Sequence, residues 1–191
     1  MKTVKTMKFM KTYMIALIAG VIAISCSSDD DNTPVVINEE EVITTVRVQL
    51  TNATVPDVTL QSVDSDGDDG PNAPVITIVG EIMANTTYAG TVTFLNETED
   101  PAEDITEEVE EEDDEHQVFF TSAAGLNVTT TYGNFDDDGN PLGTEFTLTT
   151  GDASTGNFTV TLRHEPTKPN TGLANAGGET DVEVTFNVEV E

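Results

Sequence analysis

The sequence predicts a mainly β protein: an antiparallel, Ig-like β-sandwich of about nine short strands with one short acidic helical insertion. Segments rich in Val and Thr alternate apolar and polar residues with a period of two, and clusters of Gly, Asn, Asp and Pro separate them. About nine such segments fall within roughly 150 residues, a density typical of two-sheet folds. An up-and-down barrel is the alternative architecture.

The strands are expected in chain order, and the last shows the clearest alternation. Residues 182–190 place Val and Phe on one face and Glu, Thr and Asn on the other. Residues 158–164 place three apolar side chains and His164 on one face, and Pro166 ends that strand. The full set of expected strands is 46–50, 55–63, 75–83, 88–95, 116–121, 126–132, 144–149, 158–164 and 182–190.

One segment departs from the β pattern. Asp100 and Pro101 are typical of a helix start, and Glu103 stands where a capping box places its acid. Ile105 and Val109 then form a narrow apolar stripe, followed by an acidic run. Because like charges four residues apart destabilise a helix, we expect this helix either to dock onto a sheet edge or end through its apolar stripe or to be stabilised by cations.

The N-terminal region predicts export and lipid attachment. Residues 1–25 combine basic residues with an apolar run shorter than a membrane span, which is typical of a signal peptide. The signal ends in Ala-Ile-Ser before Cys26, the only cysteine, which is typical of a lipidation site. Residues 26–40 are expected to be an acidic flexible tether and residues 41–191 a single β-sandwich domain.

The residues after Cys26 resemble the export signal that sends Bacteroidota lipoproteins to the outer face of the outer membrane. This resemblance implies a lipid-anchored protein of the outer membrane, exposed at the cell surface; a periplasm-facing position is the alternative. The residues that carry it are Ser27, Ser28, Asp29, Asp30 and Asp31.

The charge of the chain excludes some partners. All 36 acidic residues lie after residue 25, where only three of the seven basic residues remain, so loss of the signal leaves a formal charge of −33. Nucleic acid binding depends on Lys and Arg contacts to phosphate, so we expect no nucleic acid partner. Membrane attachment is expected through the N-terminal lipid.

The two histidines suggest a transition-metal site. His164 stands at the inner end of an expected core strand, and Glu165 follows it. His116 ends the acidic segment, with Asp113 and Glu112 three and four residues before it, spacings that share a helical face if the helix reaches that far. If the two segments meet, these residues can hold Zn²⁺ or Cu²⁺. The alternative is a rim histidine that is hydrogen-bonded to backbone.

Two acidic loops suggest Ca²⁺ binding, because they place carboxylates at alternating positions next to turn glycines. Neither loop matches the EF-hand spacing, and both also fit ordinary polar hairpin turns. The candidate ligands are Asp64, Asp66 and Asp68 in one loop and Asp136, Asp138 and Asn140 in the other.

No catalytic motif was found: the sequence lacks a nucleophile elbow, a glycine-rich phosphate loop and a His-Glu-x-x-His motif. We therefore expect a binding protein rather than an enzyme.

Three segments together resemble a family of short, uncharacterised flavobacterial lipoproteins. Members often carry the label "type 1 periplasmic binding fold superfamily protein", which implies solute binding at the envelope. The segments are residues 106–120 (TEEVEEEDDEHQVFF), 162–170 (LRHEPTKPN) and 177–190 (GGETDVEVTFNVEV).

Taken together, we expect an accessory module that binds a cation or a small solute at the cell envelope. The alternative is a structural or protein-interaction lipoprotein that partners an outer-membrane receptor.

Overall fold

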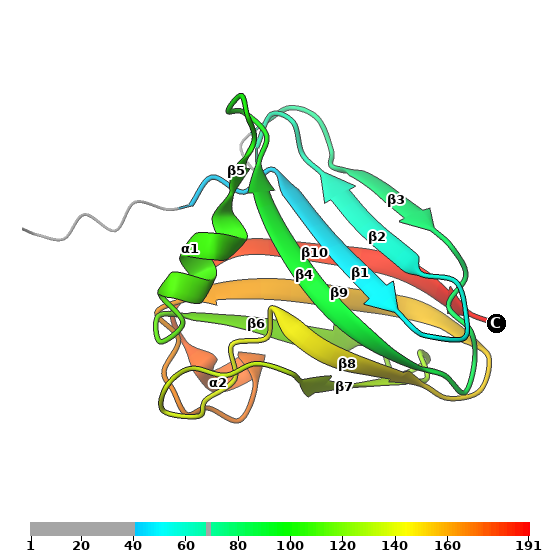
Figure 1. The fold of residues 1–191 in the computed structure, drawn as a ribbon. Helices are drawn as coiled ribbons and strands as arrows, with labels where there is room; N and C mark the ends of the chain where they lie inside the picture. The colour runs from blue at the N-terminus through cyan, green and yellow to red at the C-terminus, as the bar shows by residue number, and fades with distance from the viewer. Residues whose placement is uncertain (1–40, 68–69) are drawn as a thin grey trace, which may run out of the picture. The chain divides into compact units, whose positions relative to one another are not determined.

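A computed structural model describes residues 41–67 and 70–191. Their strands form two antiparallel sheets that face each other, so the predicted sandwich is confirmed (Figure 1). The described strands do not close into the alternative barrel. Residues Glu39–Glu191 form one compact unit. The expectations for the signal, for Cys26 and for the export tract Ser27, Ser28, Asp29, Asp30 and Asp31 lie outside the described residues.

The larger sheet, called sheet A, has seven strands in the order β3-β2-β1-β4-β8-β7, with the short β5 paired to β4. Strand β1 pairs with β2 on one side and β4 on the other, Val48 lying opposite both Leu60 and Val92. The strands are β1 (Thr45–Thr51), β2 (Val58–Val63), β3 (Val75–Val79), β4 (Thr87–Asn96), β5 (Glu103–Asp104), β7 (Val128–Tyr132) and β8 (Glu145–Thr150).

The smaller sheet, called sheet B, has three strands in the order β10-β9-β6. They are β6 (His116–Ser122), β9 (Ser154–His164) and β10 (Glu179–Val190). The register of β10 shifts between Thr180 and Val182, which marks a β-bulge. Each of the nine predicted strands is present; β5, with two residues, is the only addition among the described strands.

The core lies between the sheets and follows the predicted alternation. Sheet A contributes buried side chains such as Leu50 and Phe94, and sheet B contributes Leu162 and Phe186, all fully buried. The two sheets differ in width, and β3 at the edge of sheet A has all five residues exposed.

Helix α1 (Ile105–Glu111) closes one end of the sandwich beside β4 (Figure 1). Ile105 and Val109 are buried, which confirms the expected docking. The predicted start at Asp100 was wrong. The N-cap is Asp104, whose side chain accepts a hydrogen bond from the backbone N–H of Thr106.

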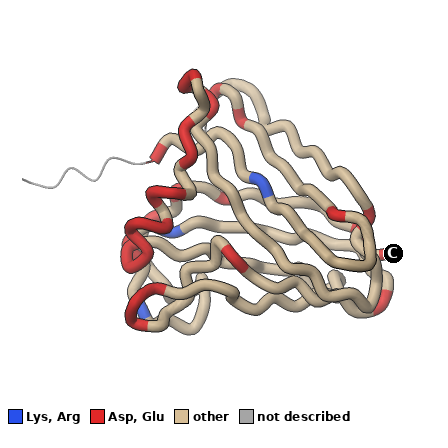
Figure 2. The backbone as a smooth tube through the Cα atoms, in the orientation of Figure 1, with Lys and Arg blue, Asp and Glu red and all other residues tan. Residues whose placement is uncertain are grey.

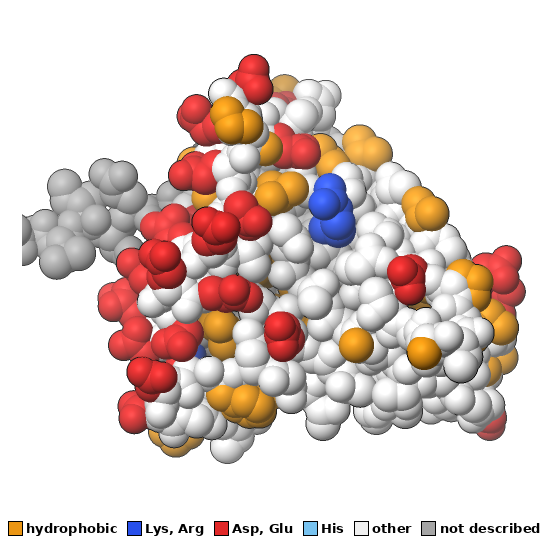
Figure 3. All heavy atoms as spheres, in the orientation of Figure 1, with side chains coloured by type: hydrophobic (Ala, Val, Ile, Leu, Met, Phe, Trp, Pro, Cys, Tyr) orange, Lys and Arg blue, Asp and Glu red, His pale blue; other side chains and the backbone are white. Residues whose placement is uncertain are grey.

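A second, four-residue helix, α2 (Leu173–Ala176), lies in the connection between β9 and β10. Within the described part of the chain, no helix is long and apolar enough to cross a membrane. Figure 2 shows acidic residues concentrated along α1 and the neighbouring loops, and Figure 3 shows their side chains covering that end of the molecule. Sheet A's visible face carries far fewer charges.

Candidate metal centre

His116 and His164 lie side by side at the α1 end of sheet B. Strands β6 and β9 pair so that His116 is directly opposite His164, both at strand ends. The centroids of their rings are 4.6 Å apart, and the planes are tilted by 35°. Their side chains are 0% and 5% exposed. The pairing register therefore brings together two imidazoles that lie 48 positions apart in the sequence.

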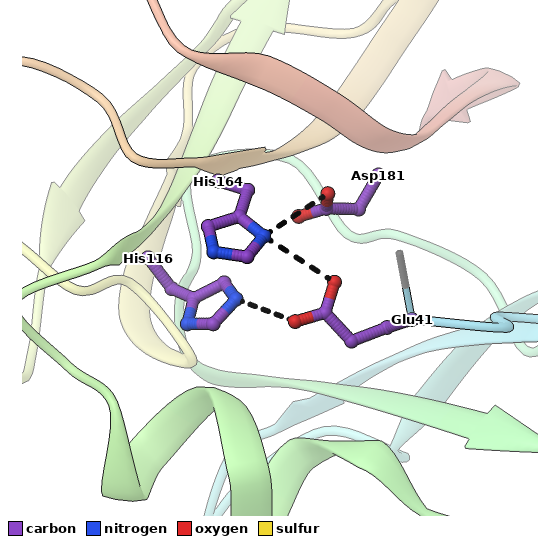
Figure 4. Close-up of side chains that lie close together, drawn as sticks. All are labelled: Glu41, His116, His164 and Asp181. Atoms are coloured by element: carbon purple, nitrogen blue, oxygen red, sulfur yellow. Dashed lines mark hydrogen bonds and ion pairs between the residues drawn. The ribbon is translucent and has the colours of Figure 1, made fainter. Parts of the chain in front are cut away.

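Glu41 reaches both histidines from the segment just before β1 (Figure 4). Its Oε1 lies 2.9 Å from Nε2 of His116, and its Oε2 lies 3.8 Å from Nδ1 of His164. The Glu41 side chain is 5% exposed, and its Oε2 makes no hydrogen bond among the described residues.

Asp181 completes the group from the bulged start of β10. Its Oδ1 lies 3.9 Å from Nδ1 of His164, and its side chain is 3% exposed. Strict alternation with Val182 and Val184 would point Asp181 to the outer face of sheet B. The bulge reverses this direction, because its extra residue breaks the period of two. We call Glu41, His116, His164 and Asp181 the histidine cluster.

The backbone before β10 needs glycine to approach this site. Gly178 has φ of 70°, and a Cβ at this position would collide with the carbonyl oxygen of His164. Glu165 also has a positive φ, 46°, and its N–H donates to the carbonyl of Glu115 at 2.6 Å. The tight backbone turn on both sides of His164 thus fixes where its ring lies.

His116 faces hydrogen-bond acceptors at both ring nitrogens. Its Nδ1 lies 3.1 Å from the carbonyl oxygen of Glu112, and its Nε2 faces the Glu41 carboxylate. A neutral imidazole has one N–H and one lone pair, so it can satisfy only one of these acceptors. With Glu41 ionised, both acceptors are satisfied if His116 is an imidazolium or if a cation lies between Nε2 and Glu41.

The pKa values of this pair follow from the same contacts. Burial lowers the pKa of His116, but the hydrogen bond and charge of Glu41, the Glu112 carbonyl and the charge of Asp181 outweigh it, so the pKa lies above its ordinary 6.5. Burial raises the pKa of Glu41, but the hydrogen bond from His116 and its other contacts hold that pKa below its ordinary 4.5.

The excess of negative charge extends from the cluster onto α1. Burial, followed by the charges of Glu41, Glu112 and Glu103, raises the pKa of Glu108. A cation bound at the cluster would lower this repulsion.

The four side chains are of the types that bind transition metals. Each offers one ligand atom, and these atoms lie within 4.8 Å of one another. Tetrahedral zinc with bonds of about 2.0–2.2 Å requires its ligands roughly 3.3–3.5 Å apart, so some must draw together by up to about 1.5 Å. The contact between Nδ1 of His116 and the Glu112 carbonyl provides the usual second contact of a metal-binding histidine, because it leaves Nε2 as the ligand atom.

The other predicted metal ligands lie around this site in different roles. Glu112 contacts His116 through its backbone carbonyl, and Asp113 uses its carbonyl to accept a hydrogen bond from Lys168. Glu165 belongs to a second, more exposed group with Glu115 and His164.

The predicted Ca²⁺ ligand Asp136 is buried and surrounded by donors. Its Oδ1 accepts from the backbone N–H groups of Asp138 and Asn140 at 3.1 and 2.7 Å. Its Oδ2 lies 3.3 Å from Nζ of Lys168. Burial raises the pKa of Asp136, but the hydrogen bonds from Asn140 and the Lys168 ammonium hold it below its ordinary 3.8. Lys168 thus supplies the positive charge that a cation would bring.

The other predicted Ca²⁺ loop is described only in part. Asp66 accepts hydrogen bonds from Asn72, and one carboxylate oxygen of Asp64 is buried without a hydrogen-bond partner among the described residues. Asp68 lies outside the described residues, so Ca²⁺ binding here stays a prediction.

Sequence reasoning missed Glu41 and Asp181. Glu41 is one of three consecutive glutamates before the first strand, and nothing in that run distinguishes it. The adjacent glycines at 177 and 178 were the available signal for Asp181, since they indicate irregular backbone before β10. Neither the run of glutamates nor the pair of glycines reveals which residues meet across the two sheets.

Comparisons with known proteins add no family assignment: no family model, no curated protein and no solved structure matches this chain.

Proposed function

We propose that the protein is an envelope lipoprotein that binds a transition-metal ion, Zn²⁺ or Cu²⁺, at the histidine cluster. The observation that carries this proposal is the position of His116 between two acceptors, beside a second histidine and two buried carboxylates. With neutral histidines, Glu41 and Asp181 put two negative charges in a site whose side chains are at most 5% exposed. A divalent cation neutralises both charges.

The ligand types favour Zn²⁺ or Cu²⁺ over Ca²⁺. Two imidazole nitrogens and two carboxylate oxygens suit the intermediate metals, whereas Ca²⁺ takes six to eight oxygen ligands. The function is binding rather than catalysis, in line with the sequence expectation.

The envelope location is part of the proposal and rests on the sequence. The signal-like residues 1–25, Cys26 and the acidic tract after it support a lipid anchor at the outer membrane, facing the cell surface or, alternatively, the periplasm. The resemblance to flavobacterial lipoproteins supports solute binding at the envelope. A strongly acidic surface also raises the local concentration of divalent cations.

The direct test uses the chain from Ser27 onward, which retains the compact unit Glu39–Glu191. After treatment with a chelator, it is titrated calorimetrically with Zn²⁺ and, separately, with Cu²⁺. We expect one ion per chain with a Kd below about 1 µM, and His116→Ala and His164→Ala each to weaken binding at least about 100-fold.

The matched control is Glu165→Gln, which lies next to His164 but outside the histidine cluster. It should leave Kd within about threefold of the unaltered chain. Binding weaker than about 1 mM, or equal binding by His116→Ala, would contradict the proposal. A large effect of Glu165→Gln with none of His116→Ala would move the site to the exposed group around Glu115.

A further inference from the structure

A groove runs along the free edge of sheet B. Its volume is about 580 Å³, and it lies between the first half of β10 and the start of β1 and end of β2. Val46, Val182 and Val184 give it an apolar part, and Ser62 lines it from β2. The groove differs from the apolar core because many of its lining residues are Asp or Glu.

The β10 side of the groove is an open strand edge. Strand β10 pairs with β9 on one side only. On its other side, the described residues make backbone hydrogen bonds only near the C-terminus, where Glu191 bonds to Ile82 and Ala84. The edge between Val182 and Asn187 is therefore available to pair with another strand.

Two isoleucines on the inner face of sheet A, in strand β3, are partly exposed. Ile76 and Ile78 pair with Ser62 and Leu60, so all four side chains point to the inner face of sheet A. Leu60 and Ser62 are buried, but Ile76 and Ile78 are 42% and 39% exposed. Among the described strands, sheet B ends at β10. A fourth strand next to β10 would cover these isoleucines.

The charges of the groove select the sequence of such a strand. No Lys or Arg is among the residues that line it. Two of its carboxylates have a buried oxygen without a hydrogen bond among the described residues, Oε2 of Glu41 and Oδ1 of Asp64. The acidic residues along the groove are Glu41, Asp64, Asp66, Glu179, Asp181 and Glu183.

We infer that this groove binds an extended segment of another protein, with alternating apolar and basic residues, as a fourth strand of sheet B. Its apolar side chains face Val182, Val184 and the uncovered isoleucines, and its backbone pairs with β10. Its Lys or Arg side chains alternate to the outer face of sheet B, where they lie beside Glu183.

Charge disfavours the two occupants that this chain could supply. Residues 27–40 contain Asp29, Asp30, Asp31, Glu39 and Glu40 and no basic residue. A second copy would present the outer-face acids of β10, Glu183 and Glu189, to an already acidic groove. Both would meet like-charge repulsion.

The test measures binding of fluorescent seven-residue peptides to the chain from Ser27 onward, by anisotropy in the presence of a chelator. The probe alternates Lys with Val or Ile, and a Glu-for-Lys peptide is its counterpart. We expect the basic peptide to bind at least about 100-fold more tightly. Methylation of alternate backbone nitrogens distinguishes strand pairing from general attraction to an acidic protein. Methyl groups on the nitrogens facing β10 should weaken binding at least about tenfold, and those on the other set far less.

Two matched pairs of substitutions on β3 locate the site. Ile76→Thr with Ile78→Thr changes the inner face and should weaken peptide binding about tenfold. Val75→Thr with Val79→Thr changes the outer face of the same strand, where both valines are more than 60% exposed, and should leave binding unchanged. Both pairs keep β-branched residues in an exposed strand, so folding is retained.

Several results would overturn the inference. If the two pairs of β3 substitutions, or the two methylation patterns, had equal effects, the peptide binding would be nonspecific charge attraction. Dimers in ultracentrifugation that Ile76→Thr with Ile78→Thr abolishes, without peptide binding, would assign the groove to a second copy. Peptide binding only when the chain begins at residue 41 would assign it to residues 27–40.

Discussion

Two regions of the described chain bury carboxylates, Asp136 and the histidine cluster, and they differ in the groups that surround the negative charge. At Asp136, backbone N–H groups, Asn140 and the Lys168 ammonium all donate to one carboxylate. At the histidine cluster, two carboxylates and a backbone carbonyl surround two imidazoles. Donors surround the carboxylate at the first site, whereas at the second site His116 faces an acceptor at each ring nitrogen.

The comparison shows that acidity alone does not identify a cation site. Both carboxylates lie in acidic segments of the chain, and the Asp136 loop has the more ion-like sequence. Lys168 nevertheless already balances Asp136, whereas no Lys or Arg contacts Glu41 among the described ion pairs. What distinguishes the two sites is which hydrogen-bond donors and acceptors surround each buried group.

The largest expected difference between the sites is their response to metal ions. Zn²⁺ at about a thousandfold excess over Kd should stabilise the protein by about 4 kcal/mol, which raises Tm by roughly 10 °C. Ca²⁺ at the same concentration should leave Tm unchanged, because Lys168 occupies the charged position at Asp136. Thermal denaturation with each ion measures both effects. A Ca²⁺ stabilisation lost in Asp136→Asn would support the calcium prediction.

The second-largest expected effect is the destabilisation caused by removing the charge of Asp136. Asp136→Asn keeps the shape of the side chain but turns an amide NH₂ toward the surrounding donors, one of them the buried ammonium of Lys168. We expect a destabilisation of roughly 2–4 kcal/mol in urea denaturation. Asp138→Asn, an exposed neighbour, is the control and should change stability by less than about 0.5 kcal/mol. Equal effects of the two substitutions would show that the hydrogen bonds and the Lys168 ion pair of Asp136 do not stabilise the protein.

The same chemical change at the histidine cluster should have a much smaller cost. In Glu41→Gln, the amide NH₂ can donate to Nε2 of neutral His116, which restores the balance of donors and acceptors. The raised pKa of His116 means that its proton stabilises the native state fully below pH 6.5, and that this contribution is lost as pH rises through the raised pKa. Glu41→Gln should therefore destabilise the metal-free protein more at pH 5.5 than at pH 9. At pH 9 the destabilisation should be less than about 1 kcal/mol.

The control for this experiment is Glu115→Gln, whose side chain is half exposed. It should show no such pH dependence in urea denaturation. A Glu41→Gln protein that is destabilised equally at pH 5.5 and pH 9 would contradict the proposed acceptor excess.

The smallest expected effect is a change in acid stability. The lowered pKa of Asp136 contributes stability that is present above its ordinary value of 3.8 and is lost as pH falls through the folded-state pKa. Asp136→Asn should therefore flatten the acid side of the stability profile between about pH 5 and 2. Urea denaturation across this range measures the slope; an unchanged slope would assign acid unfolding to other carboxylates.

The strands could be predicted from the sequence, but the helix start could not. Alternation identifies the long strands, because most of them have one buried and one exposed face; β3 is the exception, with all five residues exposed. Strand β5 was missed, since two residues carry no pattern. It pairs Glu103 with Asn96 and Asp104 with Leu95, which takes the residues that the predicted helix start would have used. Asp100 and Asp104 are equally good caps by type, so pairing with β4 decides between them.

The histidine cluster was half predictable. The sequence offered His116 and His164 as candidates but did not show that their segments meet; strand pairing places them opposite each other. Asp181 could not be predicted, because alternation puts it on the outer face and a bulge reverses it. Glu41 depends on a contact between the start of β1 and the far sheet, which no local pattern encodes.

If the proposed lipid anchor holds the protein at its N-terminus, the location of Glu41 has a mechanical consequence. This side chain comes from the residues just before β1, yet it contacts histidines of β6 and β9. Tension on the chain entering β1 would therefore load this crosslink before it loads the hydrogen bonds between β1 and its neighbours. Replacing a hydrogen bond with metal–ligand bonds strengthens the first connection to yield, so ion occupancy would set the force that the tethered domain withstands.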